Sequence, residues 1–190
     1  MKIGVLALQG AVREHLTMLR KCGSQAVAVK WPAELEGLDG LIIPGGESTT
    51  IGKLIVKYGF EQPIKDFHSA GKAIYGTCAG LILLAKRITE GHQPLLGLMD
   101  IEACRNAYGR QVDSFEADLS ISALGSKPFR GVFIRAPWIE RILSSEVEVL
   151  AEHEGRIVAA RQGRMLVTAF HPELTEDTRM HEYFLKIEIG

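Results

Sequence analysis

The stretch IYGTCAGLILL, residues 74–84, places a cysteine between two glycines and directly before an apolar run. The spacing Gly76-x-Cys78-x-Gly80 matches the nucleophile elbow, where a strand turns sharply into a helix and bulky residues would collide. A buried helix over residues 79–88 would place its N-terminus beside the thiol and favour the thiolate. The alternative is an unreactive cysteine in a strand-to-helix turn, since free cysteine is among the most buried residue types. The stretch therefore predicts an α/β fold and leaves two interpretations of Cys78 open.

Short apolar runs alternate with helical patterns in the first half of the chain. The predicted strands are residues 3–8, 25–30, 38–43 and 72–76. The spacing of Val12, Leu16 and Leu19 predicts a helix that ends near Gly23. A second helix is predicted over residues 51–59, with Ser48, Thr49 or Thr50 as its cap, and a third precedes the strand at 72–76. Strands separated by helices of this length imply right-handed crossovers and a parallel sheet covered on both faces.

The second half has short strands with tight connections. They are GVFIRAP (131–137), VEVLAEH (147–153), RIVAARQ (156–162) and MLVTAFH (165–171). Residues 153–156 and 162–164 are predicted hairpin turns, and residues 175–189 a closing helix. Because there is no linker or repeat, we expect one α/β domain over residues 1–190 with a mixed sheet. Ligands of such sheets bind beyond the carboxyl ends of the strands, where Cys78 lies.

Composition excludes several classes of protein. The 190 residues are 46% hydrophobic and 24% charged, with a net charge of −1, so no field attracts nucleic acid or anionic lipid. The apolar run over residues 3–8 is too short for a signal segment or a membrane span, and we expect a soluble, cytoplasmic protein. The three cysteines show neither CxxC nor zinc spacing, so neither a disulfide framework nor a metal site is expected.

A thiolate that attacks an acyl group needs a base and a group that orients the base. The histidines at 15, 68 and 181 fall in helical patterns and those at 92 and 153 in turns, so we expect these five at the surface. His171 instead ends a predicted strand, and Pro172 holds it extended. Residues two apart in an extended chain point the same way, so Glu173 can fix the ring tautomer of His171. Cys78, His171 and Glu173 thus form a candidate triad.

The segment PGGES, residues 44–48, follows another strand end. Its glycines let the backbone approach a substrate, and the Gly46 amide, with that of Ala79, could form an oxyanion hole. The alternative is a plain strand-to-helix turn. A phosphate loop is excluded because Glu47 and Leu54 stand where that motif needs glycine and serine or threonine.

These motifs resemble those of the triad-type (class I) glutamine amidotransferases. The resemblance is strongest to the glutaminase subunits of two-component pyridoxal 5′-phosphate synthase, the PdxT/SNO family. The segments that carry it are LALQGAVREH (6–15), PGGESTT (44–50), GTCAGLILLA (76–85), RNAYGRQVDSFEADL (105–119), VFIRAP (132–137) and HPELTED (171–177). The resemblance implies a three-layer, flavodoxin-like fold with a mixed, mostly parallel sheet.

The resemblance also implies residue roles. Cys78 would attack the amide of L-glutamine to give a thioester, His171 would move the protons, and Glu173 would orient it. The residues that the family uses to bind glutamine match Gly46, Glu47, Ser48, Arg105, Ile134 and Arg135 of this chain. Gln9 matches a glutamine near the oxyanion region, at the contact with the synthase subunit.

A partner is implied by what the chain lacks. The family pattern contains no cofactor and no sugar phosphate site, so ammonia would pass to the synthase subunit in a large ring-based hetero-oligomer that activates the glutaminase. Two rival hypotheses stay open. One is an elbow-cysteine enzyme of the DJ-1/PfpI type that acts alone on peptides or aldehydes. The other is a regulatory subunit without catalysis.

Overall fold

The computed structural model describes residues 1–105 and 114–189. The strands of its large sheet are β1 (Lys2–Leu6), β2 (Gln25–Val29), β3 (Gly40–Ile43), β4 (Ala73–Thr77), β5 (Ala85–Ile88), β6 (Met99–Cys104), β9 (Trp138–Ile142), β10 (Val147–His153), β11 (Arg156–Gln162) and β12 (Met165–Thr168). A separate hairpin contains β7 (Ser114–Leu119) and β8 (Phe129–Ile134). The α-helices are α1 (Val12–Lys21), α2 (Ser48–Lys57), α3 (Glu61–Ser69), α4 (Ala79–Leu84) and α5 (Arg179–Ile189). Short 3-10 turns are η1 (Pro32–Leu35), η2 (Ser122–Leu124) and η3 (Pro172–Leu174).

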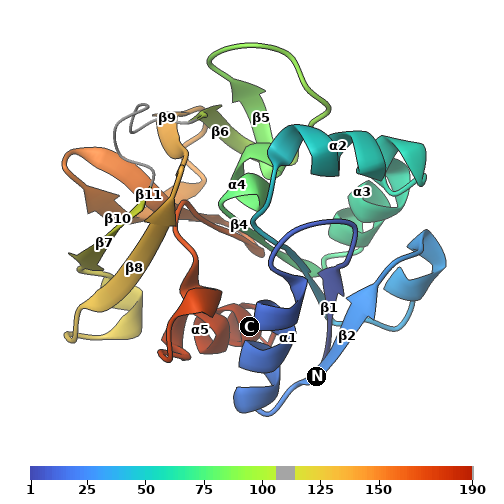
Figure 1. Ribbon diagram of the computed structural model, residues 1–190, viewed down its shortest axis with the longest axis horizontal. Coiled ribbons are helices and arrows are strands. Elements are labelled where there is room, and N and C mark those ends of the chain that lie inside the picture. The colour runs from blue at the N-terminus through green and yellow to red at the C-terminus, as the bar shows by residue number, and fades with distance from the viewer. Residues whose placement is uncertain (106–113, 190) are drawn as a thin grey trace.

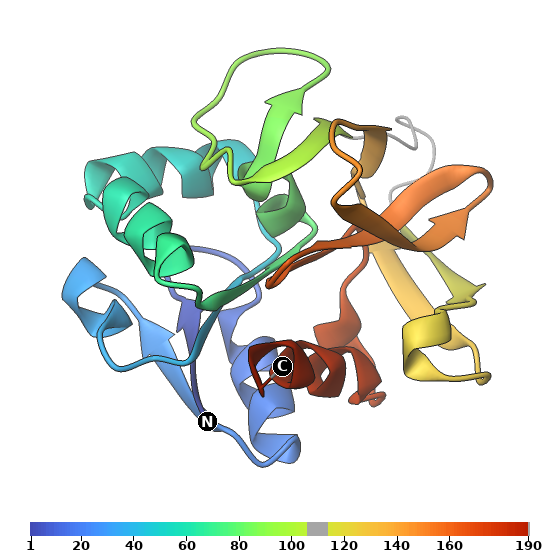
Figure 2. The same cartoon turned by 180° about the vertical axis from the view of Figure 1, so that it is seen from behind.

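The first half of the chain forms a parallel sheet in the order β2-β1-β3-β4, and β12 joins it in parallel beside β4. Strands β3, β4 and β12 are buried along their whole length, as expected for strands covered on both faces. Figures 1 and 2 show α1 and α5 together on one face and α2 and α3 on the other. This arrangement confirms the predicted three-layer α/β fold and brings α1 and α5 beside the strands that carry the site.

The second half adds antiparallel pairs. Strand β11 is antiparallel to β12, β10 and β9, and the sheet continues through β6 to β5. The predicted turn at residues 153–156 joins β10 to β11, with Glu154 and Gly155 both in the left-handed region, and the predicted turn at 162–164 joins β11 to β12. The central sheet is therefore mixed and mostly parallel, as predicted.

Two local predictions were wrong. The helix predicted over residues 79–88 ends at Leu84, because residues 85–88 pair with β6 as strand β5 and the Lys86 ammonium bonds the Asp100 carboxylate. The cap of α2 is Glu47 rather than a hydroxyl residue at 48–50, and its carboxylate accepts the backbone amides of Thr49 and Thr50. In the described ranges, no helix is long and apolar enough to cross a membrane.

Candidate active site

The cysteine lies in a strained turn at the carboxyl end of β4. Its backbone has a φ of 49° and a ψ of −100°, in a region that residues with a Cβ rarely adopt. A Cβ on Gly76 would lie 2.6 Å from the Gly80 carbonyl, and one on Gly80 would lie 2.2 Å from the oxygen of Ile43. The two glycines are therefore required by packing, as the elbow hypothesis predicts. The Cys78 side chain is buried but for 7% of its surface.

His171 and Glu173 form a short hydrogen bond after β12. The His171 Nδ1 lies 2.7 Å from Oε1 of Glu173, so the ring donates from this nitrogen and its Nε2 is left for the thiol. Burial opposes protonation of His171, but hydrogen bonds with Cys78 and Glu173 outweigh it and raise the pKa of His171 to about 10. Burial also opposes ionisation of Glu173, and the neighbouring His15 and His171 outweigh it and lower the pKa of Glu173. The arrangement suits an imidazolium–thiolate pair held by a carboxylate.

The glycine loop after β3 packs directly on this pair. A Cβ on Gly45 would lie 2.3 Å from Cε1 of His171 and 3.3 Å from Cβ of Cys78. The next residue in the loop, Gly46, is exposed, and the Glu47 amide donates to Oε1 of Gln9 at 2.9 Å. Ala79 begins α4, where the first amides of a helix have no acceptor within that helix. The structure thus places Gly46 and Ala79 on the two segments that flank Cys78.

The residues expected to bind glutamine lie on two sides of the thiol. On one side, the Ile134 carbonyl is 3.9 Å from the Cys78 sulfur, and Arg135 follows it with a φ of 41°. On the other side, Arg105 donates from Nη2 to the Thr49 hydroxyl at 3.3 Å. This side also holds Glu47 and Ser48 at the start of α2, as described above.

One amide in this region was not found from the sequence. The Gln93 carbonyl oxygen accepts the Ser48 hydroxyl at 3.0 Å, and its buried amide nitrogen has no hydrogen-bond partner in the described residues. Gln93 lies in a loop without apolar periodicity, so no sequence signal placed it here. Residues 106–113 of the RNAYGRQ motif lie outside the described residues.

Two histidines expected at the surface are buried beside the site. His15 of α1 and His181 of α5 are both 0% exposed, and their rings lie 2.9 Å apart, between Nδ1 of His15 and Nε2 of His181. The surface prediction was wrong because both lie on the apolar stripes of their helices, His15 with Leu19 and His181 with Phe184. That position was a usable signal, since a histidine on an apolar stripe needs a buried polar partner. Of the other three, His92 is exposed and His68 and His153 are half-buried.

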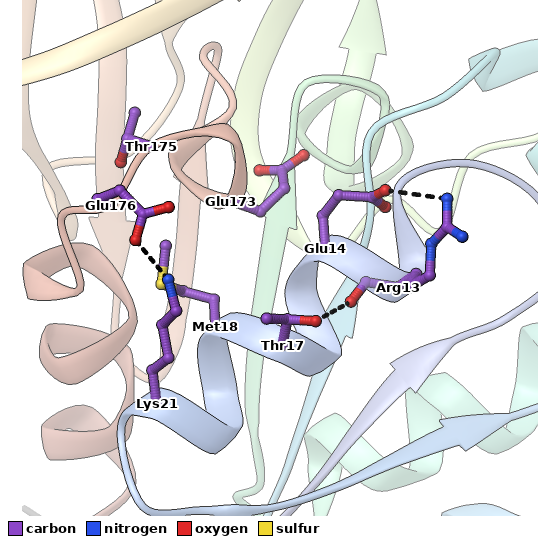
Figure 3. A pocket seen from close by; sticks show the side chains of 8 residues that line it. All are labelled: Arg13, Glu14, Thr17, Met18, Lys21, Glu173, Thr175 and Glu176. Carbon is purple, nitrogen blue, oxygen red and sulfur yellow. Dashed lines mark hydrogen bonds and ion pairs between the residues drawn. The ribbon is translucent and has the colours of Figure 1, made fainter.

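A hollow of about 240 Å³ lies between α1 and the segment after β12. Figure 3 shows Glu173 between Glu14 of α1 and Glu176 of its own segment, with Lys21 bonded to Glu176. Neither Cys78 nor His171 lines this hollow, so a substrate bound there would not reach the thiol.

Comparisons with known proteins agree with this geometry. The model of the SNO glutamine amidotransferase family matches residues 5–189. The pyridoxal 5′-phosphate synthase subunit PdxT of Geobacillus sp. (strain WCH70) is 60% identical over 98% of this chain and 96% of its own length. The protein of the same name from Moorella thermoacetica is 55% identical over 98% of this chain and 99% of its own. A solved structure described as a glutamine amidotransferase superposes with a TM-score of 0.93 at 50% identity, covering 99% of each chain. The chain belongs to the SNO glutamine amidotransferase family.

Proposed function

We propose that this chain hydrolyses L-glutamine to L-glutamate and ammonia through Cys78, His171 and Glu173, and supplies the ammonia to a pyridoxal 5′-phosphate synthase subunit. The observation that carries the proposal is the strained elbow of Cys78 beside the short His171–Glu173 hydrogen bond. We treat residues 1–190 as one glutaminase domain. Family membership and the names of the curated relatives support the substrate and the partner.

The first half of the reaction breaks the amide bond. The Cys78 thiolate attacks the side-chain carbonyl carbon of glutamine, and the carbonyl oxygen becomes an oxyanion. Amides of Gly46 and Ala79 stabilise this charge. The protonated His171 donates its Nε2 proton to the amide nitrogen, ammonia leaves, and a γ-glutamyl thioester remains on Cys78.

The second half regenerates the thiol. His171, now neutral, takes a proton from water while the water oxygen attacks the thioester carbonyl. The carbon–sulfur bond breaks, glutamate leaves, and the sulfur and His171 again share one proton. Glu173 keeps the Nδ1 proton of His171 in place throughout, so that Nε2 always faces the thiol.

Substrate recognition uses charges of both signs. Glutamine carries a carboxylate and an ammonium, and a guanidinium grips a carboxylate with two parallel hydrogen bonds. We assign the carboxylate to Arg105 or Arg135, and further contacts to Gly46, Glu47, Ser48 and Ile134. Gln9 holds the Glu47 amide and so positions the glycine loop.

The partner is a synthase subunit that consumes ammonia as it forms. Free ammonia is protonated in water and escapes, so docking and a closed path to the partner conserve it. We place the complex in the cytoplasm as a ring-based hetero-oligomer, as the family resemblance implies.

The test is ammonia release from glutamine with and without the synthase subunit, for the wild type and for Cys78→Ala and His171→Asn. We expect both variants to lose turnover by at least about 1,000-fold, as in triads that lose a member. Cys104→Ala is the matched control, because Cys104 is a free, partly buried cysteine that belongs to β6.

Three results would contradict the proposal. Unchanged turnover in either variant would end the triad assignment. Activity on peptides or methylglyoxal with none on glutamine would favour an enzyme that acts alone. A Cys78 thiol that fails to react with a glutamine-analogue electrophile, even with the synthase present, would favour a regulatory subunit.

A further inference from the structure

Two buried histidines have no part in the chemistry proposed above. His15 and His181 come from two helices that lie beside each other (Figure 1), and Nδ1 of His15 is 2.9 Å from Nε2 of His181. Nε2 of His15 is 3.4 Å from Oε2 of Glu173, a charge contact rather than a hydrogen bond, since Oε2 has no hydrogen-bond partner in the described residues; both side chains are 0% exposed. The other carboxylate oxygen, Oε1, bonds His171. The carboxylate of Glu173 is therefore flanked by two imidazoles, one at each oxygen.

Hydrogen-bond accounting decides the tautomer of His15. Burial lowers the pKa of His15 and lowers that of His181 to about 3, so both rings are neutral and each has one N–H group. The Glu173 carboxylate repels a lone pair, so the His15 nitrogen that faces it, Nε2, carries the hydrogen and donates it to the Thr77 hydroxyl oxygen, 3.1 Å away. Nδ1 of His15 then accepts from Nε2 of His181, and Nδ1 of His181 is left as a lone pair.

The opposite tautomer is less favourable, although its Nε2 lone pair would accept the Thr77 hydroxyl. It would turn a lone pair of His15 toward the Glu173 carboxylate. It would also leave an N–H at Nδ1 of His181, a buried atom that has no hydrogen-bond partner in the described residues. Orphaned buried N–H groups are rarer in folded proteins than under-satisfied acceptors.

Nε2 of His15 is also connected to the glycine loop. It lies 3.1 Å from the Thr77 hydroxyl oxygen, which accepts the Gly45 amide at 3.0 Å. The Gly45 carbonyl in turn accepts the Ala11 amide at 2.9 Å, just before the helix that carries His15. A closed ring of contacts thus joins α1, the glycine loop, the residue before Cys78 and the triad carboxylate.

We infer that His15 is a positioning residue for the glutaminase reaction, which orients Glu173 through Nε2 and ties it to the glycine loop through Thr77. His181 fixes the tautomer in which His15 can do this. The inference rests on the triad proposed above, and it assigns no contact between either histidine and the substrate.

The first experiment compares two substitutions of His15 in the complete complex with the synthase subunit. His15→Leu fills the space but removes the donor, whereas the amide of His15→Gln can place an N–H near the position of Nε2. We expect His15→Leu to lower kcat by about 10- to 100-fold with KM within about threefold, as for other residues that orient an active-site ligand. His15→Gln should recover most of that loss. His68→Leu on α3 is the matched control, because it removes a half-buried histidine away from the triad and should leave kcat unchanged.

The second experiment reads the tautomer directly. Nitrogen NMR of the histidine-labelled wild-type protein should show His15 protonated at Nε2, and His181→Leu should give a mixture of both tautomers with a smaller fall in kcat. This measurement needs neither activity nor a variant of His15, so it holds even if His15→Leu does not fold. His15 protonated at Nδ1 in the wild type would overturn the inference. So would a His15→Leu variant with the kcat of the wild type. A His15→Gln variant that folds but has the same low kcat as His15→Leu would overturn it too.

The two proposals fail separately. If Cys78→Ala or His171→Asn keeps its turnover in the same assay, the triad itself is wrong. If both lose turnover while His15→Leu retains the wild-type kcat, only the positioning role of His15 is wrong.

Discussion

The two sides of the His171 ring are built from different kinds of structure. On the thiol side stand loops that follow strands, with exposed residues such as Gly46 and with left-handed backbone at Cys78 and Arg135. On the carboxylate side stand two helices, whose His15 and His181 are wholly buried with Glu173. Loops allow close approach and adjustment where the substrate binds, whereas packed helices hold the group that must not move. The difference separates residues that meet the substrate from residues that keep the proton in place.

The largest effect is expected from Glu173→Gln, on the carboxylate side. A glutamine amide can turn an N–H toward Nδ1 of His171 and so favour the wrong tautomer of the ring. In a serine protease the corresponding change lowers kcat by about 10,000-fold, and we expect a loss of about 1,000-fold or more in ammonia release. Glu176→Gln, in the same segment but exposed, is the control. A loss below tenfold would mean that the carboxylate side does not set the geometry of His171.

The next effect is expected from Gly45→Ala, on the thiol side. The added Cβ would lie 2.3 Å from Cε1 of His171, so the ring or the loop must shift. A shift of about 1 Å at reacting atoms costs about 100-fold in kcat. Overpacking should also lower the free energy of unfolding by about 1–3 kcal/mol. Gly40→Ala separates the two effects: Gly40 starts β3 at the far end of the strand, where the contacts are 3.1 Å or longer, and kcat should not change.

A smaller overall effect is expected from Arg105→Ala, which should weaken glutamine binding and leave the chemical step almost unchanged. Loss of a charge-assisted hydrogen bond to the glutamine carboxylate costs about 1.5–3 kcal/mol, which is about a 10- to 100-fold rise in KM. The kcat should change little, because Arg105 contacts Thr49 and not the triad. Arg20→Ala, on the exposed face of α1, should leave both constants unchanged. A fall in kcat at constant KM would move Arg105 from the binding role to a positioning role.

The smallest effect concerns pH. The pKa of His171 is raised to about 10 in the folded protein from the usual 6.5, so its protonation stabilises the fold. This stabilisation is complete below pH 6.5 and is lost as the pH rises through 10. In Cys78→Ala one of the groups that raise the pKa is gone, so NMR titration should give a lower pKa for His171 and stability should fall at a lower pH. The same titration curve in both proteins would show that the thiol side does not affect the ring.

Local chemistry explains which parts of the structure the sequence predicted. The elbow and its helix start depend on glycines within two residues of Cys78, and the His171–Glu173 pair depends on extended backbone over three residues. Such features are visible in a short window. The pairing of residues 85–88 with β6 is not visible in a short window. These residues continue a helical pattern, but they form hydrogen bonds with a strand that comes later in the chain.

The buried histidines needed another kind of information. Each lies on an apolar stripe, a signal of burial that the surface prediction overlooked, and the partner of His15 is 166 residues away in α5. Only the layered fold brings α1 and α5 to the same face of the sheet (Figures 1 and 2). The contacts of His15 and His181 on the carboxylate side therefore depend on the tertiary fold, and no local spacing predicts them.

Helix α5 follows every other described element in chain order, and it closes the carboxylate side of the site. Without α5 packed beside α1, His15 would lose its buried partner His181. We therefore expect α5 to be needed for full glutaminase activity, although it contributes no residue to the triad.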